Sequence, residues 1–115
     1  MKGTNLGEFE ELLLLVVVRL YPEAYGLSIR EELKSTAGRA VAMGAIHAAL
    51  NRLEEKNFLS SELATGTHER GGRRKRLFTL THAGKQALEH NRSLRNNLWE
   101  SIPQLSWKNL KYEVS

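Results

Sequence analysis

Residues 58–84, "FLSSELATGTHERGGRRKRLFTLTHAG", carry two short apolar runs separated by a cluster of cationic side chains around two adjacent glycines. The runs at 58–63 and 76–81 have the length and alternation of β-strands, with Phe78 and Leu80 expected to face inward. The glycine-bearing segment between them is typical of a turn. This stretch therefore predicts a two-stranded hairpin with a strongly basic loop.

Three helices are expected before the hairpin, because apolar residues recur at helical spacing at about 7–20, 27–37 and 42–57. Proline interrupts a helix, whereas glycine and asparagine accept the left-handed geometry of a C-terminal cap. The residues expected to end the three helices are accordingly Pro22, Gly38 and Asn57. The apolar stripe of the first helix consists of Phe9, Leu12, Leu13, Val16, Val17 and Leu20.

A longer helix is expected after the hairpin, with Thr81 as its N-cap and an end near Ile102, because Pro103 interferes with its continuation. The residues expected to face inward on this helix are Ala87, Leu94 and Leu98.

The order helix, helix, helix, strand, loop, strand is that of a winged helix-turn-helix, in which the hairpin loop is the wing. The predicted fold class is mainly α with a small β-hairpin. A winged helix-turn-helix DNA-binding domain is expected at 1–81, followed by a C-terminal dimerisation helix and tail at 82–115.

The composition, with 115 residues of which 41% are hydrophobic and 26% charged, indicates one soluble domain. The apolar run at 12–18 is shorter than the roughly 18 residues that a membrane span needs. Acidic residues at Glu8, Glu10 and Glu11 stand where a secretory signal would be basic. With neither a membrane span nor a secretory signal indicated, a cytoplasmic location is expected. The chain has no cysteine, which excludes disulfides, thiolate zinc sites and cysteine nucleophiles and fits a reducing compartment.

The positive charge is concentrated in one segment. Residues 66–76 hold five Lys and Arg side chains and one glutamate, a local charge of +4, which equals the formal net charge of the whole chain. Such a cluster favours a polyanionic partner, because it attracts phosphates and releases condensed counterions on binding. The alternative is a solvated basic loop without a partner.

No enzyme class is indicated. The histidines at 47, 68, 82 and 90 are spread over different elements, and none has the spacing of a zinc-binding helix. The segment "RGGRR" at 70–74 lacks the lysine and hydroxyl residue of a phosphate-binding P-loop, and no GxGxxG or GxSxG motif occurs. We expect no catalytic residues, no metal and no cofactor.

The third helix has the composition of a helix that enters the major groove of DNA. Small residues let its backbone approach, and polar side chains can reach base edges or phosphates. The candidate DNA-binding residues of this helix are Met43, Gly44, Ala45, His47, Ala48, Asn51 and Arg52. Ala45 and Ala48 are equally compatible with tight packing between helices.

The candidate DNA-binding residues of the wing are Arg70, Arg73, Arg74, Lys75 and Arg76. Arginine on phosphates or in a narrow minor groove is a recurrent mode of DNA attachment. The alternative is an interaction module whose basic loop binds an anionic membrane surface or a protein partner. DNA is favoured, because these cations lie on a hairpin beside a helix-turn-helix rather than on an amphipathic helix with insertable aromatics.

Four blocks of the sequence resemble successive blocks of the PadR family of bacterial transcription regulators. They are "LGEFEELLLLVVVRL" (6–20), "AYGLSIREEL" (24–33), "MGAIHAALNRLEEKNFL" (43–59) and "RGGRRKRLFTLTHAG" (70–84). The resemblance implies a dimer whose recognition helices and wings grip operator DNA, and repression relieved by a small, often aromatic molecule. Two positions depart from the family pattern: His47 stands where a tyrosine is usual, and Asn57 where a glycine is usual.

The C-terminal helix is longer than one small domain needs, and two copies of a winged helix on palindromic half-sites are the usual route to specificity. We therefore expect a homodimer with Leu94, Leu98 and Ile102 at its interface. Trp99 is a candidate ligand residue, since two copies across the axis could stack a flat aromatic effector; plain interface packing is the alternative.

Overall fold

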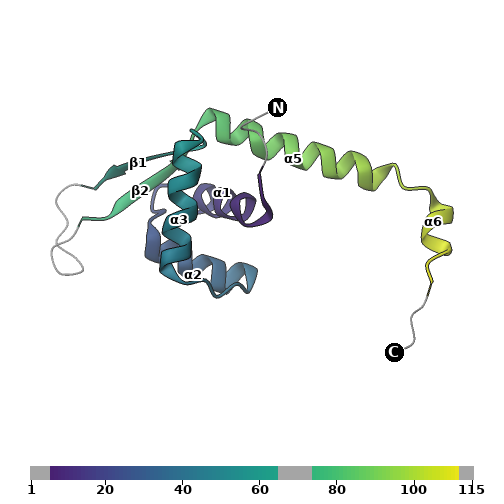
Figure 1. Cartoon of the computed structure of the whole chain (residues 1–115), viewed down its shortest axis with the longest axis horizontal. Coiled ribbons are helices and arrows are strands. Elements are labelled where there is room, and N and C mark those ends of the chain that lie inside the picture. The colour runs from purple at the N-terminus through teal and green to yellow at the C-terminus, as the bar shows by residue number, and fades with distance from the viewer. Residues whose placement is uncertain (1–5, 65–73, 112–115) are drawn as a thin grey trace.

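The computed structural model describes residues 6–64 and 74–111 and confirms the predicted fold class (Figure 1). In chain order its elements are α1 (Glu8–Leu20), α2 (Gly26–Ala37), α3 (Met43–Glu55), β1 (Leu59–Leu63), β2 (Arg76–Leu80), α5 (His82–Glu100) and α6 (Gln104–Lys108). Among the described residues, no helix is both long and apolar enough to cross a membrane.

Helix α1 lies at the centre of the molecule and packs against α2, α3, β2 and α5. Its side chains Leu13, Leu14 and Val17 are completely buried. Leu14 lies off the apolar stripe predicted for this helix, and it is buried because neighbouring elements cover α1 on more than one side. Partners from the other elements complete the core: Ala24, Ile29, Leu33, Ile46, Ala49, Leu50, Leu53, Phe58, Leu59, Phe78 and Ala87.

Local chemistry ends and starts the helices where the sequence predicted. Gly38 has a φ of 66° and Asn57 a φ of 67°, so both adopt the left-handed conformation expected after a helix. Thr81 is the N-cap of α5, and its Oγ1 accepts a hydrogen bond from the Gly84 N–H at 3.0 Å.

The two strands form an antiparallel hairpin in which Leu59 lies opposite Leu80 and Leu63 opposite Arg76. Each predicted strand is one residue too long, because Phe58 and Thr81 lie just outside the ladder. The Thr81 N–H still donates to the Phe58 carbonyl at 3.1 Å. A second bond, from the Phe78 N–H to the Ala24 carbonyl at 2.8 Å, ties β2 to the segment that precedes α2.

Helix α5 begins in the core and then leaves it as an arm, with α6 at the far end (Figure 1). Its only described buried residues are Gly84 and Ala87. The prediction that Leu94 and Leu98 face inward is wrong for the single chain, where they are 53% and 62% exposed, because α5 has already left the core at these positions. The radius of gyration is 17.9 Å, against the roughly 13 Å of a compact domain of this length.

Candidate nucleic-acid interface

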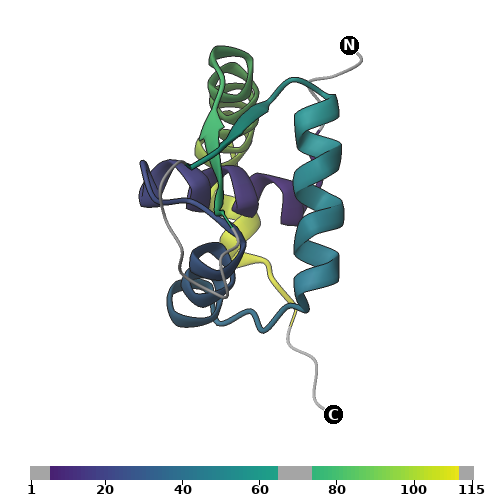
Figure 2. The ribbon, with the colours of Figure 1, turned by 90° about the vertical axis from the view of Figure 1, so that its left-hand side faces the viewer.

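Helix α3 stands along one edge of the molecule, next to α2 and the hairpin (Figure 2). Its core face carries Ile46, Ala49, Leu50 and Leu53, all completely buried. The remaining faces are open to solvent over most of the helix. The helix is therefore held by one apolar face and can present the other to a partner.

The outer face of α3 begins with small residues. Apart from its chain neighbours and the backbone of its own helix, a Cβ added to Gly44 would have no atom within 4 Å, so the space beside this residue is open. Ala45 and Ala48 are both exposed. The sequence left two interpretations of these alanines open. Tight packing against another helix of the chain is excluded by their exposure, and close approach of a partner to the α3 backbone remains.

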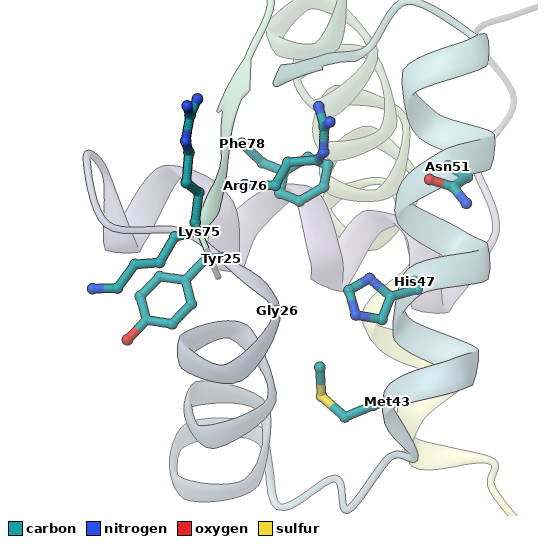
Figure 3. A pocket seen from close by; sticks show the side chains of 9 residues that line it. Tyr25, Gly26, Met43, His47, Asn51, Lys75, Arg76 and Phe78 are labelled. Atoms are coloured by element: carbon teal, nitrogen blue, oxygen red, sulfur yellow. The ribbon is translucent and has the colours of Figure 1, made fainter. Parts of the chain in front are cut away.

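A hollow of about 370 Å³ lies between α3, the start of α2 and the root of the hairpin loop (Figure 3). The residues that line it are Tyr25, Gly26, Met43, His47, Asn51, Arg74, Lys75, Arg76 and Phe78. Three of these side chains are cationic and none is acidic. A hollow with this charge attracts an anion such as a phosphate group.

His47 and Met43 point from α3 toward the first turn of α2 (Figure 3). A Cβ added to Gly26 would lie 2.9 Å from Met43 Cε and 3.1 Å from His47 Cε1. The absence of a side chain on Gly26 therefore lets both α3 side chains lie across the start of α2.

The start of α2 is fixed by Ser28. Its Oγ accepts a hydrogen bond from the Tyr25 N–H at 2.9 Å and lies 2.7 Å from the Glu23 carbonyl oxygen, to which it donates. Sequence reasoning did not single out Tyr25 or Gly26 as site residues. The sequence signal that could have identified them is an aromatic residue followed by a glycine at the start of a helix, because Ser, Thr, Asp or Asn is usual at the N-cap.

Lys75 is packed rather than free on the loop. Its Nζ lies 4.5 Å from the centroid of the Tyr25 ring and 3.8 Å from a Glu23 carboxylate oxygen. Only 16% of the Lys75 side chain is exposed. A cation and an aromatic ring at this distance attract each other, so Lys75 holds the chain just before β2 against the start of α2.

Arg76 is held from the other side of the hairpin. Its guanidinium donates to Ser61 Oγ at 2.9 Å, and the Ser61 hydroxyl donates to a Glu54 carboxylate oxygen at 2.7 Å. These two bonds connect β2, β1 and α3. Arg74, the first described residue after the loop, is exposed.

Arg52 does not line the hollow. Its Nε lies 3.7 Å from Glu10 on α1, and Lys56 Nζ lies 3.1 Å from the same carboxylate. Partial burial raises the pKa of Glu10, but the hydrogen bond from the Gly7 N–H and the two cations outweigh it, so the pKa lies below its ordinary value of 4.5. Arg52 thus lies on the side of α3 that faces α1.

The structure brings together Met43, His47, Asn51, Arg74, Lys75 and Arg76 among the predicted DNA-binding residues. Gly44, Ala45 and Ala48 lie on the same helix and are exposed. The predicted wing residues Arg70 and Arg73 lie outside the described residues.

The other predicted site residues lie on the arm. Leu94, Leu98 and Trp99 are exposed on α5, and Ile102 is half-buried just after it. Trp99 is 67% exposed, and its ring centroid lies 5.4 Å from that of Trp107 on α6. Within residues 6–64 and 74–111, no three histidine or acidic side chains are grouped to hold a metal ion.

Solved structures of similar fold are transcription regulators. The chain is 28% identical to a PadR-like transcription factor from Bacteroides fragilis, with 81% of this chain and 84% of that one covered and a TM-score of 0.67. It is 23% identical to a PadR family transcription regulator from Clostridium difficile R20291, with 83% and 96% covered and a TM-score of 0.63.

A third solved structure is Bacillus subtilis PadR in complex with operator DNA. The identity is 19% and the TM-score 0.60, and 94% of this chain is covered but only 52% of that one. No curated protein matches the chain.

The model of the PadR-like transcriptional regulator family matches residues 13–90, from the middle of α1 to the first half of α5. This match includes the hollow and both strands of the hairpin. The chain belongs to the PadR-like family of transcriptional regulators.

Proposed function

We propose that this regulator is a homodimeric repressor that binds a palindromic operator, with one α3 helix in the major groove of each half-site. The observation that carries the proposal is the hollow in which His47 and Asn51 of α3 lie beside Arg74 and Arg76 of the hairpin, with no acidic residue among its lining side chains. Side chains able to read bases and cations able to hold phosphates thus lie side by side, which supports the proposal.

The proposal divides two tasks between these elements. His47 and Asn51 carry groups that can hydrogen-bond with base edges, and the open surface at Gly44, Ala45 and Ala48 lets the helix backbone approach the DNA. The wing, including Arg70 and Arg73, attaches to phosphates irrespective of sequence. The operator complex of Bacillus subtilis PadR, which shares this fold, supports DNA as the partner.

The homodimer is proposed from the arm. Leu94 and Leu98 are more than half exposed, and an α-helix with such residues gains stability by burying them against a partner. Two copies related by a two-fold axis bury the same surface on both chains, and this axis then matches that of a palindromic operator. In this proposal residues 1–81 bind DNA and residues 82–115 make the dimer.

A small aromatic effector is the second part of the proposal. Trp99 is 67% exposed on the arm, and its copy in the other chain would supply a second ring face. Titration with a planar aromatic cation, followed by tryptophan fluorescence, tests this. Quenching in the native protein that persists in Trp107→Leu and disappears in Trp99→Leu is expected, and equal quenching in all three proteins contradicts it.

The central experiment compares specific and random DNA. A binding site is first selected with the native protein from a random duplex library, and its sequence shows whether it is palindromic. Asn51→Ala and His47→Ala should lower the ratio of specific to random affinity, because they remove base contacts. Arg74→Ala should weaken both affinities alike, and Lys85→Ala, on exposed α5 surface, is the control. If both α3 variants keep the native ratio, α3 is not the reading element.

A further inference from the structure

The polar face of α3 that carries His47 and Asn51 ends in a carboxylate. His47, Asn51 and Glu54 follow one another at intervals of four and three residues, a spacing that places their side chains on one face of a helix. His47 and Asn51 line the cationic hollow, and Glu54 lies about one turn beyond it. A carboxylate on a face that meets DNA repels phosphates. Glu54 should therefore weaken DNA binding unless its charge serves another purpose.

The Glu54 carboxylate is joined to Arg76 through the hydroxyl of Ser61. This hydroxyl donates to Glu54 Oε2 at 2.7 Å, and its oxygen accepts a hydrogen bond from the Arg76 guanidinium at 2.9 Å. A hydroxyl can donate and accept at the same time, so Ser61 uses both capacities here. Each bond includes a charged group, which makes it stronger than a bond between neutral groups. Glu54 on α3 thereby holds Arg76 on β2 by way of β1.

The register of the hairpin keeps these side chains together. Ser61 lies opposite Phe78, and Arg76 precedes Phe78 by two residues. The side chains of Ser61, Arg76 and Phe78 therefore lie on the same face of the hairpin. Phe78 is buried in the core, whereas Arg76 remains exposed and lines the hollow with Asn51 (Figure 3). The guanidinium is thus held at the edge of the core, beside the hollow.

We propose that Glu54 and Ser61 are positioning residues that hold the Arg76 guanidinium ready for a phosphate group of DNA. With α3 in the major groove and the hairpin beside it, the sugar-phosphate strand that borders the groove would pass between these two elements. The hollow lies between them, and Arg76 reaches it from β2. This inference rests on the function proposed above and deepens it, because it assigns a favourable role in DNA binding to an acidic residue.

The benefit comes from the restricted freedom of the Arg76 side chain. A long side chain on the surface samples many rotamers, and fixing it when a partner binds costs conformational entropy. The bond to Ser61 uses only part of the donor capacity of the guanidinium, so other N–H groups remain for phosphate oxygens. A guanidinium that is held before DNA arrives loses less entropy on binding and contributes more to the affinity.

The first test uses the sign of a charge effect. Glu54→Gln removes a negative charge, which by long-range attraction alone should raise the affinity for DNA about twofold. We expect instead a loss on the order of threefold for the selected duplex, because a neutral amide holds the Ser61 hydroxyl less strongly. Glu55→Gln, at the next and exposed position of α3, is the matched control and should show the gain. Fluorescence anisotropy measures both affinities. An affinity of Glu54→Gln equal to or above that of Glu55→Gln overturns the proposal.

The second test changes no charge. Ser61→Ala should lower the affinity on the order of fivefold and reduce the slope of log K against log salt, by at most the value of about 0.9 expected for one phosphate contact. Ser61→Thr keeps the hydroxyl and should restore native affinity and slope. Ser60→Ala is the control, since successive side chains of a strand point to opposite faces. A loss in Ser61→Thr as large as in Ser61→Ala, or equal affinities of Ser61→Ala and Ser60→Ala, contradicts the positioning role.

The Arg76→Ala background shows whether these residues act through Arg76. In this background Ser61→Ala should have no further effect, and Glu54→Gln should raise the affinity as Glu55→Gln does. Losses as large as in the native chain overturn the positioning role.

The same variants separate this inference from the proposed function. If Arg76→Ala weakens DNA binding but Glu54→Gln and Ser61→Ala do not, the positioning role is wrong and Arg76 remains in the interface. If Arg76→Ala, His47→Ala and Asn51→Ala all bind DNA as the native chain does, the proposed DNA-binding surface is wrong, and this inference fails with it.

Discussion

Gly84, in the first turn of α5, lies against the backbone of Phe58, the residue directly before β1. A Cβ added to Gly84 would stand 2.4 Å from the Phe58 carbonyl oxygen. Real side-chain atoms do not approach a backbone oxygen so closely, and a backbone atom cannot rotate away as a side chain can. This contact therefore fixes the position of the first turn of α5 against the residue that precedes β1.

Gly84→Ala should accordingly destabilise the protein by about 1–3 kcal/mol, because the helix must shift away from Phe58. Gly44→Ala is the matched control. It lies in a helix with open space around it, so alanine should stabilise α3 by about 0.5–1 kcal/mol. Urea unfolding followed by circular dichroism measures both variants. Equal effects of the two substitutions would show that the close contact with Phe58 is absent.

The lowered pKa of the Glu10 carboxyl predicts that the stability of the protein falls at acidic pH. The folded-state pKa of this carboxyl is lowered, so its contribution is present above the ordinary value of 4.5 and is lost as the pH falls through the folded-state pKa. Glu10→Gln should therefore reduce stability at pH 7 and flatten the loss of stability below about pH 4.5. In a Lys56→Gln background the same substitution should matter less, since one of the stabilising cations is already absent. This account is contradicted if Glu10→Gln loses stability below about pH 4.5 as steeply as the native protein does.

The wing should contribute attachment that depends on salt. Replacing Arg73 and Arg74 together by alanine should weaken binding to every duplex. It should also lower the slope of log K against log salt by about 0.9 for each phosphate contact that is lost. Fluorescence anisotropy at several salt concentrations gives both quantities. Unchanged affinity together with an unchanged slope would remove the wing from the interface.

Gly26→Ala should lower the affinity for DNA while leaving the stability of the fold almost unchanged. The atoms nearest to the added methyl group are at the ends of the Met43 and His47 side chains. These ends can move at little cost, so thermal stability should change by no more than a few degrees. Affinity for the selected site should still fall, because His47 is displaced from the start of α2. In a His47→Ala background the added effect should be small. A full further loss there would show that Gly26 acts through another residue.

We expect the protein to become a monomer when apolar residues of the arm are replaced by aspartate. Leu94 and Leu98 are exposed in the single chain, so Leu94→Asp and Leu98→Asp should leave its folding intact. The dimer should dissociate, because it would bury the new carboxylates without a partner charge. Light scattering at micromolar concentration measures the mass, with Leu63→Asp on the hairpin as control. Removal of all residues after Leu88 should have the same result. A truncated chain that dimerises as tightly as the native one contradicts the assignment.

The sequence by itself determined α1, α2, α3, the two strands and α5, and most of their ends, whereas α6 (Gln104–Lys108) was not predicted. Gly38 and Asn57 accept a positive φ, and Thr81 offers a hydroxyl to the first turn of α5; these are properties of one residue and its immediate neighbours. The alternation at 76–80 and the apolar spacing of α3 likewise depend on local periodicity. His47, Asn51, Arg74 and Arg76 could be assigned to one surface from the order of the elements alone.

Only the tertiary structure decided which of the polar residues meet. Arg52 and Asn51 are adjacent in sequence, yet Arg52 lies beside Glu10 of α1 while Asn51 lines the hollow. Tyr25 and Lys75 are brought together because the Phe78 N–H bonds to the Ala24 carbonyl, a contact between segments more than 50 residues apart. Leu14 is buried and Leu94 exposed for the same reason. Burial depends on what the rest of the chain places over a side chain, and helical spacing specifies only the face on which that side chain lies.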